Sequence, residues 1–299
     1  MTVVRVRPLE LDDVDAVVER VRNALAADAA HNPLIEPDVD ATTLAASLRA
    51  TRTSCLVAVE DDVVLGHLYG EVLADGASDA WTGPDGWSGP EAAMSLLRAE
   101  ARERWRASGV RAHHAWVRDD PGVLAPWLAE GYLVEDVRGL RALDEPSVDL
   151  DGYRLRHGRD VEAALHFDEL IDAANDESPA RGSGRRERRR ALSDLLEDPE
   201  VTQYLLERDG HVLAQCIAFA LEPTRATPPR TLHLSAVAVE IRARRRGVAR
   251  TLVRAVLSEG ASRGFTHAQV TWRPANAAAS HLWRALGFRT TYARLVREL

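Results

Sequence analysis

The sequence predicts an α/β protein made of two domains of the same kind, each a mixed central sheet flanked by helices. Apolar, β-branched runs alternate with amphipathic helical patterns along all 299 residues. The order of these elements, βααββ(β)αβαβ, occurs once in each half of the chain. Between the halves, Asp144-Glu145-Pro146-Ser147 has the composition of a linker. We therefore expect domains at residues 1–145 and 150–299, with ligand sites at the ends of strands.

The first half opens with a short alternating strand and a helix whose apolar residues recur at helical spacing, from Val14 to Leu25. A hairpin with its turn at Asp61-Asp62 follows. The expected elements are, in order, strand 3–7, helix 11–26, helix 44–49, strands 55–60 and 63–73, a loop at 75–89 rich in Gly, Asp, Trp and Pro, helix 90–107, strand 112–118, helix 123–130 and strand 132–143.

The second half repeats this order, with the turn of its hairpin at Asp209-Gly210. Its β-branched, apolar strand 232–239 leads through a basic turn into a helix. The expected elements are strand 153–156, helix 161–174, a polar loop at 175–184, helix 186–196, strands 201–207, 211–222 and 232–239, helix 248–257, strand 267–272, helix 277–286 and strand 290–297.

The basic residues are all arginine, 38 in number, because the chain contains no lysine. This excludes a Walker A lysine, a Schiff-base lysine and a pyridoxal-phosphate enzyme. The net charge of −8 divides unevenly: residues 1–150 hold 14 Arg against 27 acidic residues, and residues 151–299 hold 24 Arg against 19. An anionic ligand is therefore attracted to the second half. Nucleic acid is not expected as a partner, because the chain is acidic and its arginines lack interleaved aromatics.

Other classes of protein are excluded by what the sequence lacks. No apolar run approaches the roughly 20 residues that span a bilayer. The charged first fifteen residues do not resemble a signal peptide, so we expect a cytoplasmic protein with no membrane partner. Cys55 and Cys216 lie in apolar runs typical of core thiols, and no Cys or His pair has metal-ligand spacing. We expect neither a disulfide nor a metal.

A strand, a basic turn and a helix meet at Arg244-Arg245-Arg246-Gly247-Val248-Ala249. A helix that begins at such a turn directs its unpaired N–H groups and the positive end of its dipole toward the turn. Gly247 has no Cβ, so a ligand oxygen can approach the backbone, and the small Ala249 keeps the first helical turn clear. The pattern is typical of a phosphate site, although an arginine run is also common on solvated helix faces.

Three further features accompany this turn. The strand before it ends in Val237-Ala238-Val239, and the motif Asn276-x-x-Ala279-x-x-Leu282-Trp283-x-x-x-Gly287-Phe288 follows it, with 26 residues between Ala249 and Asn276. In these features the second half resembles the GCN5-related N-acetyltransferase (GNAT) superfamily. Arg244-x-x-Gly247-x-Ala249 matches the family's pyrophosphate loop, residues 237–239 resemble the strand that pairs with the pantetheine arm, and the motif from Asn276 matches a second family motif. The interval between them leaves room for the family's helix and splayed strand. The resemblance covers residues 152–299 and implies a tandem member whose second domain binds acetyl-CoA.

The first half resembles a degraded copy of the same fold. Asp120, Leu124, Trp127 and Gly131-Tyr132 echo the second motif, and Gly86 to Glu91 stands where the loop would be. There Pro90 lacks an N–H and Glu91 places a negative charge at the helix N-terminus, which opposes a pyrophosphate. We expect this domain to lack CoA.

The resemblance implies direct attack of an amine on the thioester through a tetrahedral transition state, with residues 237–239 offering a backbone N–H to the oxyanion. Some family members carry a base on the central strand, eleven residues before the loop, which here is His233. His233 could take a proton directly or through water, with Ser235 as a relay. Alternatively, it could be a structural residue of a buried strand whose hydrogen bonds are satisfied within the protein.

Two positions of the second motif, Trp283 and Asn276, each allow two interpretations. Trp283 replaces the tyrosine that the resemblance implies as general acid, and an indole N–H does not protonate a thiolate. Tyr204 and Tyr292 are candidate substitutes for that acid or ordinary core residues. Asn276 is expected to hydrogen-bond the cofactor or to be a plain N-cap.

These residues predict an acetyl-CoA-dependent N-acetyltransferase acting on a small metabolite or a peptide N-terminus. A narrower alternative is a mycothiol synthase, a tandem member of the superfamily. An alternative of another class is a catalytically silent CoA-binding sensor or scaffold, which the Trp283 substitution and the degraded first half motivate. The expected assembly is a monomeric pseudo-dimer or a homodimer.

Overall fold

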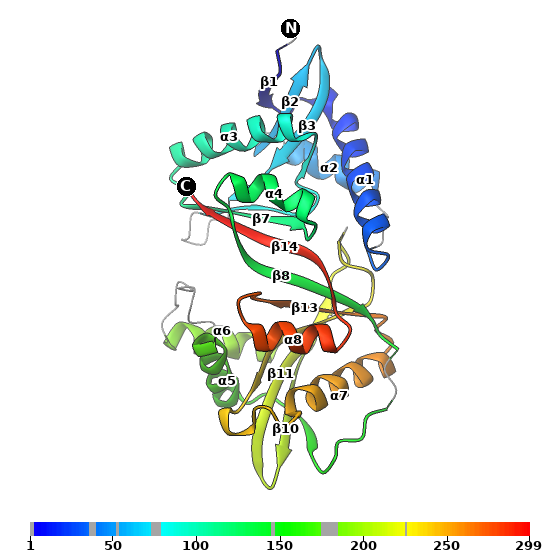
Figure 1. The fold of residues 1–299 in the computed structure, drawn as a ribbon, viewed down its shortest axis with the longest axis vertical. Helices are drawn as coiled ribbons and strands as arrows, with labels where there is room; N and C mark the ends of the chain where they lie inside the picture. The colour runs from blue at the N-terminus through cyan, green and yellow to red at the C-terminus, as the bar shows by residue number, and fades with distance from the viewer. Residues whose placement is uncertain are drawn as a thin grey trace. The chain divides into compact units, whose positions relative to one another are not determined.

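The chain folds into two compact units, residues 1–137 with 291–299 and residues 138–290. The first unit thus includes the last strand of the chain, which the predicted range 150–299 assigns to the second domain. The computed structural model (Figure 1) describes residues 3–35, 40–51, 54–72, 79–144, 147–174, 185–224 and 226–299, with 185–188 described by their backbone alone. The predicted polar loop at 175–184 lies outside the described residues.

The first unit combines an antiparallel sheet, in the order β1-β2-β3-β6, with a second group of neighbouring strands, β4-β5-β7-β14-β8. Its strands are β1 (Arg5–Pro8), β2 (Cys55–Glu60), β3 (Val63–Tyr69), β4 (Glu71–Val72), β5 (Asp79–Thr82), β6 (Trp87–Ser88), β7 (Ala112–Arg118), β8 (Leu133–Ala142) and β14 (Arg289–Glu298). Its helices are η1 (Leu11–Asp13), α1 (Val14–His31), α2 (Ala41–Ala50), α3 (Glu91–Ala107) and α4 (Pro121–Ala129).

The core of the first unit follows from the apolar spacing of its first helix. Val14, Val17, Val21 and Leu25 of α1 are almost completely buried and pack with residues of α2, β2 and β3. Burial of each such side chain contributes about 1.5–3 kcal/mol relative to exposure. The predicted helix and the hairpin after it are therefore confirmed.

The backbone conformation of Asp61 and Asp62 explains where the chain reverses between β2 and β3. Asp61 and Asp62 have φ of 47° and 64°, the left-handed pair that a tight hairpin with the correct twist requires. The predicted hairpin turn is thus confirmed. The prediction of a loop over 75–89 is wrong in part, because β5 and β6 lie within it; both strands are short and flanked by Gly and Pro, which hides their pattern.

The second unit contains a single run of neighbouring strands, with the order β8-β13-β12-β11-β10-β9 among its described residues. Its own strands are β9 (Arg154–Gly158), β10 (Val201–Arg208), β11 (His211–Leu221), β12 (Thr231–Val239) and β13 (His267–Trp272), and β8 enters it from residue 138. Its helices are α5 (Val161–Ala174), α6 (Arg185–Glu197), η3 (Ile241–Ala243), α7 (Val248–Ser262) and α8 (Ala277–Ala285).

Helices cover both faces of this sheet, with α5 and α6 on one side of β10 and β11 and α7 on the other (Figure 1). On the α5 side, Ala164, Leu196, Val201 and Ile217 form a buried cluster. On the α7 side, Gly260 lies so close to the Leu232 side chain that an added Cβ would approach it to 2.7 Å. The two faces of β12 therefore have different neighbours, which sets the geometry of the site below.

Both cysteines are free and buried, Cys55 in the first unit and Cys216 in the second. Burial raises the pKa of the Cys55 thiol to about 12 and raises that of Cys216 as well. Both are therefore core thiols rather than nucleophiles. In the part of the chain that the structure describes, no helix is long and apolar enough to cross a membrane.

Candidate functional site

An open cleft of about 850 Å³ lies in the second unit, between α5, the end of β12, the start of α7, and α8. It is lined by nearly all the residues singled out from the sequence: His233, Ser235, Val237, Ala238, Val239, Arg244, Arg245, Gly247, Val248, Ala249, Asn276, Ala279 and Trp283. Of the predicted loop residues, Arg246 is the one outside this lining.

The cleft opens where two parallel strands part. β12 pairs with β13 from Thr231 opposite His267 to Leu234 opposite Val270, and the pairing ends there. Both strands continue, β12 to Val239 and β13 to Trp272. The separated ends expose backbone edges to the cleft, so an extended ligand arm can lie along β12 and use its main-chain groups.

A β-bulge in β12 lies at the point of separation. Ile217 of β11 faces Ser235, whereas Gln215 faces Ala238, so β12 carries one extra residue over this interval. Within the bulge Ala236 has φ of 46°, an unusual value for a residue with a side chain. Bulges leave a residue out of the ladder and often occur next to active sites. The backbone that the resemblance assigns to the oxyanion is therefore in an irregular strand.

The turn before α7 is open to a ligand. Gly247 is the N-cap of this 15-residue helix, with φ of 79°. A Cβ added at Gly247 would have no atom within 4 Å. The first N–H groups of α7 have no acceptor within the helix, and the dipole of the helix is positive at this end. These features together make a place for an anion.

The charges around the cleft favour an anion as well. Of the described residues that line it, four are arginines, Arg244, Arg245, Arg250 and Arg273, and none is acidic. Arg244 Nε donates a hydrogen bond to the carbonyl oxygen of Val239 at 3.2 Å, which ties the turn to the end of β12.

The start of α8 borders the other side of the cleft. Asn276 is its N-cap, and its Oδ1 accepts the N–H of Ala279 at 3.0 Å. The capping role is thus observed, while a role in ligand binding stays a prediction. Trp283 is buried and its ring meets that of Phe288 edge-on, with centroids 5.3 Å apart. These contacts hold the start of α8 and the Trp283 side chain in place, and both form one wall of the cleft.

His233 lies on the α5 face of β12, next to Phe219, with ring centroids 5.0 Å apart. Its Nδ1 is buried and has no hydrogen-bond partner among the described residues. Burial, together with the Arg138 guanidinium, lowers the pKa of His233 to about 4. The imidazole is therefore neutral near pH 7 and can accept a proton.

Neither tyrosine considered as an acid lines the cleft. Tyr204 is buried, and its hydroxyl donates a hydrogen bond to Glu259 at 2.9 Å. Tyr292 lies in the first unit, where its hydroxyl donates to Asp28 at 2.8 Å. Burial raises the pKa of Tyr204, which makes proton donation from it still less favourable.

Several residues of the cleft have no signal in the sequence. Leu170, Ile171 and Ala174 of α5 line it, but they read as the apolar stripe of an ordinary helix. Their contribution depends on the packing of α5 against β12, which no local pattern reveals. The described residues contain no cluster of three or more His, Cys, Asp or Glu side chains that could hold a metal ion.

The corresponding turn in the first unit is closed by its own backbone. Gly89 and Gly66 approach so closely that a Cβ at Gly89 would lie 2.9 Å from the Gly66 Cα, and one at Gly66 2.6 Å from the Ser88 carbonyl oxygen. Pro90 is the N-cap of α3 and makes no side-chain capping bond.

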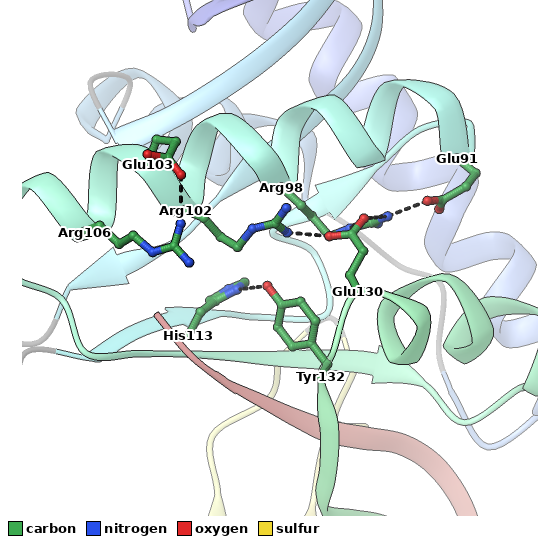
Figure 2. Close-up of polar contacts among 8 residues, drawn as sticks. All are labelled: Glu91, Arg98, Arg102, Glu103, Arg106, His113, Glu130 and Tyr132. Atoms are coloured by element: carbon green, nitrogen blue, oxygen red, sulfur yellow. Dashed lines mark hydrogen bonds and ion pairs between the residues drawn. The ribbon is translucent and has the colours of Figure 1, made fainter.

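A network of ion pairs begins at this turn (Figure 2). The Glu91 carboxylate pairs with Arg98, whose side chain is completely buried. Arg98 also donates to Glu130 at 2.6 Å and 2.8 Å, and Glu130 in turn pairs with Arg102. The chain's own Glu91 carboxylate thus lies at the N-terminus of α3, at the position that a phosphate would take.

Comparison with known proteins identifies the second unit's domain. Residues 167–288 match the model of the acetyltransferase (GNAT) family. No curated protein sequence matches the chain.

Solved structures share the fold over the whole chain. A GCN5-related N-acetyltransferase from Sphaerobacter thermophilus has a TM-score of 0.65 at 18% identity, covering 99% of this chain and 95% of that one. A tandem GNAT protein from the clavulanic acid biosynthesis pathway, solved without AcCoA, has a TM-score of 0.54 at 19% identity, covering 99% and 98%. A glucosamine N-acetyltransferase region of a fungal multi-domain GH3 β-N-acetylglucosaminidase has a TM-score of 0.56 at 15% identity, covering 99% of this chain and 38% of that one. The likenesses show the fold that these proteins share.

Proposed function

We propose that the chain is a GNAT-type N-acetyltransferase whose second unit binds acetyl-CoA and transfers the acetyl group to an amine. The observation that carries the proposal is the cleft that runs from the parted ends of β12 and β13 to the open left-handed turn at Gly247. It joins an exposed strand edge to a helix N-terminus, which suits a ligand with an amide-containing arm and a phosphate group.

In this proposal the pyrophosphate lies at the N–H groups of residues 247–249, near Arg244 and Arg245. The pantetheine arm lies along Val237, Ala238 and Val239. Asn276, Ala279 and Trp283 form the facing wall. The geometry supports this placement because the space beside Gly247 is open and the arginines lining the cleft carry the opposite charge.

The reaction would proceed by addition and elimination. The amine nitrogen attacks the thioester carbonyl carbon, a C–N bond forms, the C–S bond breaks, and CoA leaves as a thiolate. His233 accepts the N–H proton, either directly or through a water held by Ser235. Once nitrogen has added, its ammonium proton is far more acidic than in the free amine, so a weakly basic imidazole suffices. No acid is assigned, because a thiolate is a stable leaving group.

The first unit acts in this proposal without CoA. The Glu91–Arg98–Glu130 network and the closed Gly66–Gly89 contact support its loss of the phosphate site. Its role is then structural.

The acceptor in this proposal is a small metabolite or a peptide N-terminus, and the reaction is cytoplasmic. A mycothiol synthase-like reaction is a narrower form of the same proposal.

Incubation with acetyl-CoA and a panel of amines tests the function. Thiol release, followed with a thiol reagent, should accelerate with at least one amine. His233→Asn should lower kcat about 100-fold while the KM for acetyl-CoA stays near its wild-type value. His211→Asn, at the exposed start of β11, is the matched control and should match wild type. If no amine accelerates thiol release while acetyl-CoA still raises the Tm, the chain binds the donor without transferring it.

A further inference from the structure

The buried polar atoms of the second unit that have no hydrogen-bond partner within the described residues include Nδ1 of His233 and Oε1 of Gln269. Gln269 is 5% exposed, so solvent does not compensate for the missing bond. A buried polar atom without a partner destabilises the folded state. Such groups are uncommon in folded proteins, and each calls for an explanation.

The two residues are direct neighbours in the sheet. In the parallel ladder between β12 and β13, His233 is the register partner of Gln269. Side chains of register partners leave the same face of a sheet, about 5 Å apart at Cβ. The ring of Phe219 borders His233 from β11, on the other side. Both unpartnered atoms therefore belong to neighbouring side chains on the α5 face of the sheet. The pair lies next to the last register pair of β12 and β13, Leu234 and Val270, after which the strands part.

Burial, together with one neighbouring charge, keeps the imidazole of His233 neutral. Arg138 of β8, the strand beside β13, is the charged group that acts on it. α5 packs against β12 and carries the carboxylates Asp168, Glu169 and Asp172. A neutral imidazole has a single N–H, and whether it serves as a base depends on which nitrogen carries it. A neutral carboxamide can fix that choice without adding a charge.

We propose that Gln269 is a positioning residue whose Oε1 accepts the Nδ1–H of His233 in the loaded enzyme, leaving Nε2 unprotonated as the base that faces the acceptor amine. The proposal rests on the proposed function, since it gives His233 the role of base. The two atoms are not bonded in this structure, and catalytic hydrogen bonds commonly tighten only when the substrates are bound. This arrangement follows the general rule that a base is oriented by a third group.

The tautomer of His233 gives the most direct readout, because it is observed in the wild-type protein. ¹⁵N chemical shifts of the imidazole, assigned through the signal that disappears in His233→Asn, distinguish the two neutral tautomers. With acetyl-CoA bound we expect the Nδ1–H form. The Nε2–H form in the loaded protein would overturn the proposal.

Two substitutions at Gln269 test the same point through catalysis. Gln269→Met keeps the volume and removes the acceptor, so kcat should fall 10- to 100-fold while the KM and Kd for acetyl-CoA stay unchanged. Gln269→Glu supplies an anion beside the ring, so the acid limb of the kcat/KM profile and the NMR titration of His233 should both move to higher pH. Unchanged kcat in Gln269→Met, together with an unmoved titration in Gln269→Glu, would contradict the proposal.

A matched control separates loss of packing from loss of orientation. Gln215 is also completely buried and lies on the neighbouring strand β11, where its Oε1 accepts a hydrogen bond from Gln203 at 2.8 Å. Gln215→Met should lower the Tm but leave the titration of His233 and the pH profile as in wild type. If wild-type protein transfers acetyl to no amine, the proposed function fails, whereas the NMR tautomer and titration still decide the pairing of His233 with Gln269.

Discussion

Arg245 and Gly247, two positions apart at the start of α7, both have a left-handed backbone, with φ of 63° and 79°. For Gly247 this conformation is free of strain, but for Arg245 it costs roughly 1–2 kcal/mol. Turns of this kind make concave groups of N–H donors that hold anions. Arg245, which is strained, and Gly247, which has open space beside it, therefore belong to one turn. We expect its conformation to serve ligand binding rather than stability.

Salt should weaken binding of acetyl-CoA at this turn. In the proposed complex the phosphates lie near Arg244, Arg245 and the positive end of the helix dipole, and the Debye length falls from about 10 Å at 0.1 M salt to roughly 3 Å at 1 M. We expect the Kd for acetyl-CoA to rise at least several-fold between these salt concentrations in calorimetric titrations. The binding of pantetheine, which lacks the phosphates, should change little. Equal salt dependence for both ligands would show that the phosphates do not contact the arginines.

One acetyl-CoA should bind per chain. The turn at Gly247 has no atom within 4 Å of an added Cβ, whereas the turn at Gly89 is in backbone contact with Gly66. The Glu91 carboxylate also repels a phosphate at the start of α3. Isothermal titration of the full chain should give a stoichiometry near one. A second site of similar affinity, which persists in a Gly247→Glu variant, would assign CoA binding to the first unit.

Glu130→Gln should destabilise the first unit by about 3 kcal/mol, since it removes the main counter-charge of the completely buried Arg98 side chain. The control is Glu103→Gln, which breaks the exposed pair with Arg106 at 2.8 Å, also drawn in Figure 2. An exposed pair contributes less than about 1 kcal/mol. Urea denaturation should separate the two variants; equal effects would mean that the buried network does not hold the unit together.

His113 should make the first unit sensitive to acid. Its Nδ1 accepts from the Tyr132 hydroxyl at 2.7 Å, and its Nε2–H donates to Thr82 at 2.9 Å, since the Thr82 hydroxyl itself donates to the carbonyl oxygen of Tyr69. Burial, with smaller effects of His114, Arg102 and Arg98, lowers the pKa of His113 to about 3. The unfolded state, with a pKa near 6.5, binds the proton first, so stability is complete above about pH 6.5 and decreases as the pH falls toward 3.

At pH 5 this difference amounts to about 2 kcal/mol. We expect the free energy of unfolding to fall by that much more, between pH 7 and pH 5, in wild type than in His113→Gln. Urea denaturation at the two pH values measures it, and the exposed His211→Gln should behave as wild type. The same loss in all three proteins would show that His113 does not carry the acid sensitivity.

The sequence predicts those parts of the site that depend on local chemistry. Gly247 supplies the left-handed turn, and Asn276 caps α8, because glycine and asparagine are selected by backbone geometry within a few residues. Both positions could therefore be found from residue type and spacing alone.

Other features depend on long-range packing and leave no such trace. Ala236 occupies the bulge with φ of 46°, although alanine carries no signal for that conformation. β14 pairs with β7 from Tyr292 opposite Arg118 to Glu298 opposite Ala112, and a strand's own pattern does not name its partner. The neighbouring positions of His233 and Gln269 likewise follow from the register of two strands about thirty residues apart, not from either strand by itself.

The affinity of a Gly247→Glu variant for acetyl-CoA tests whether the turn at Gly247 binds the phosphates of acetyl-CoA. Gly264 is the matched control, because it follows α7 at its other end, has a similar φ of 89°, and also has no atom within 4 Å of an added Cβ. Glutamate at either position introduces the same backbone strain and the same charge. Isothermal titration should show binding lost, by at least 100-fold in Kd, in Gly247→Glu and retained in Gly264→Glu. Wild-type affinity in Gly247→Glu would contradict the assignment of the turn to acetyl-CoA.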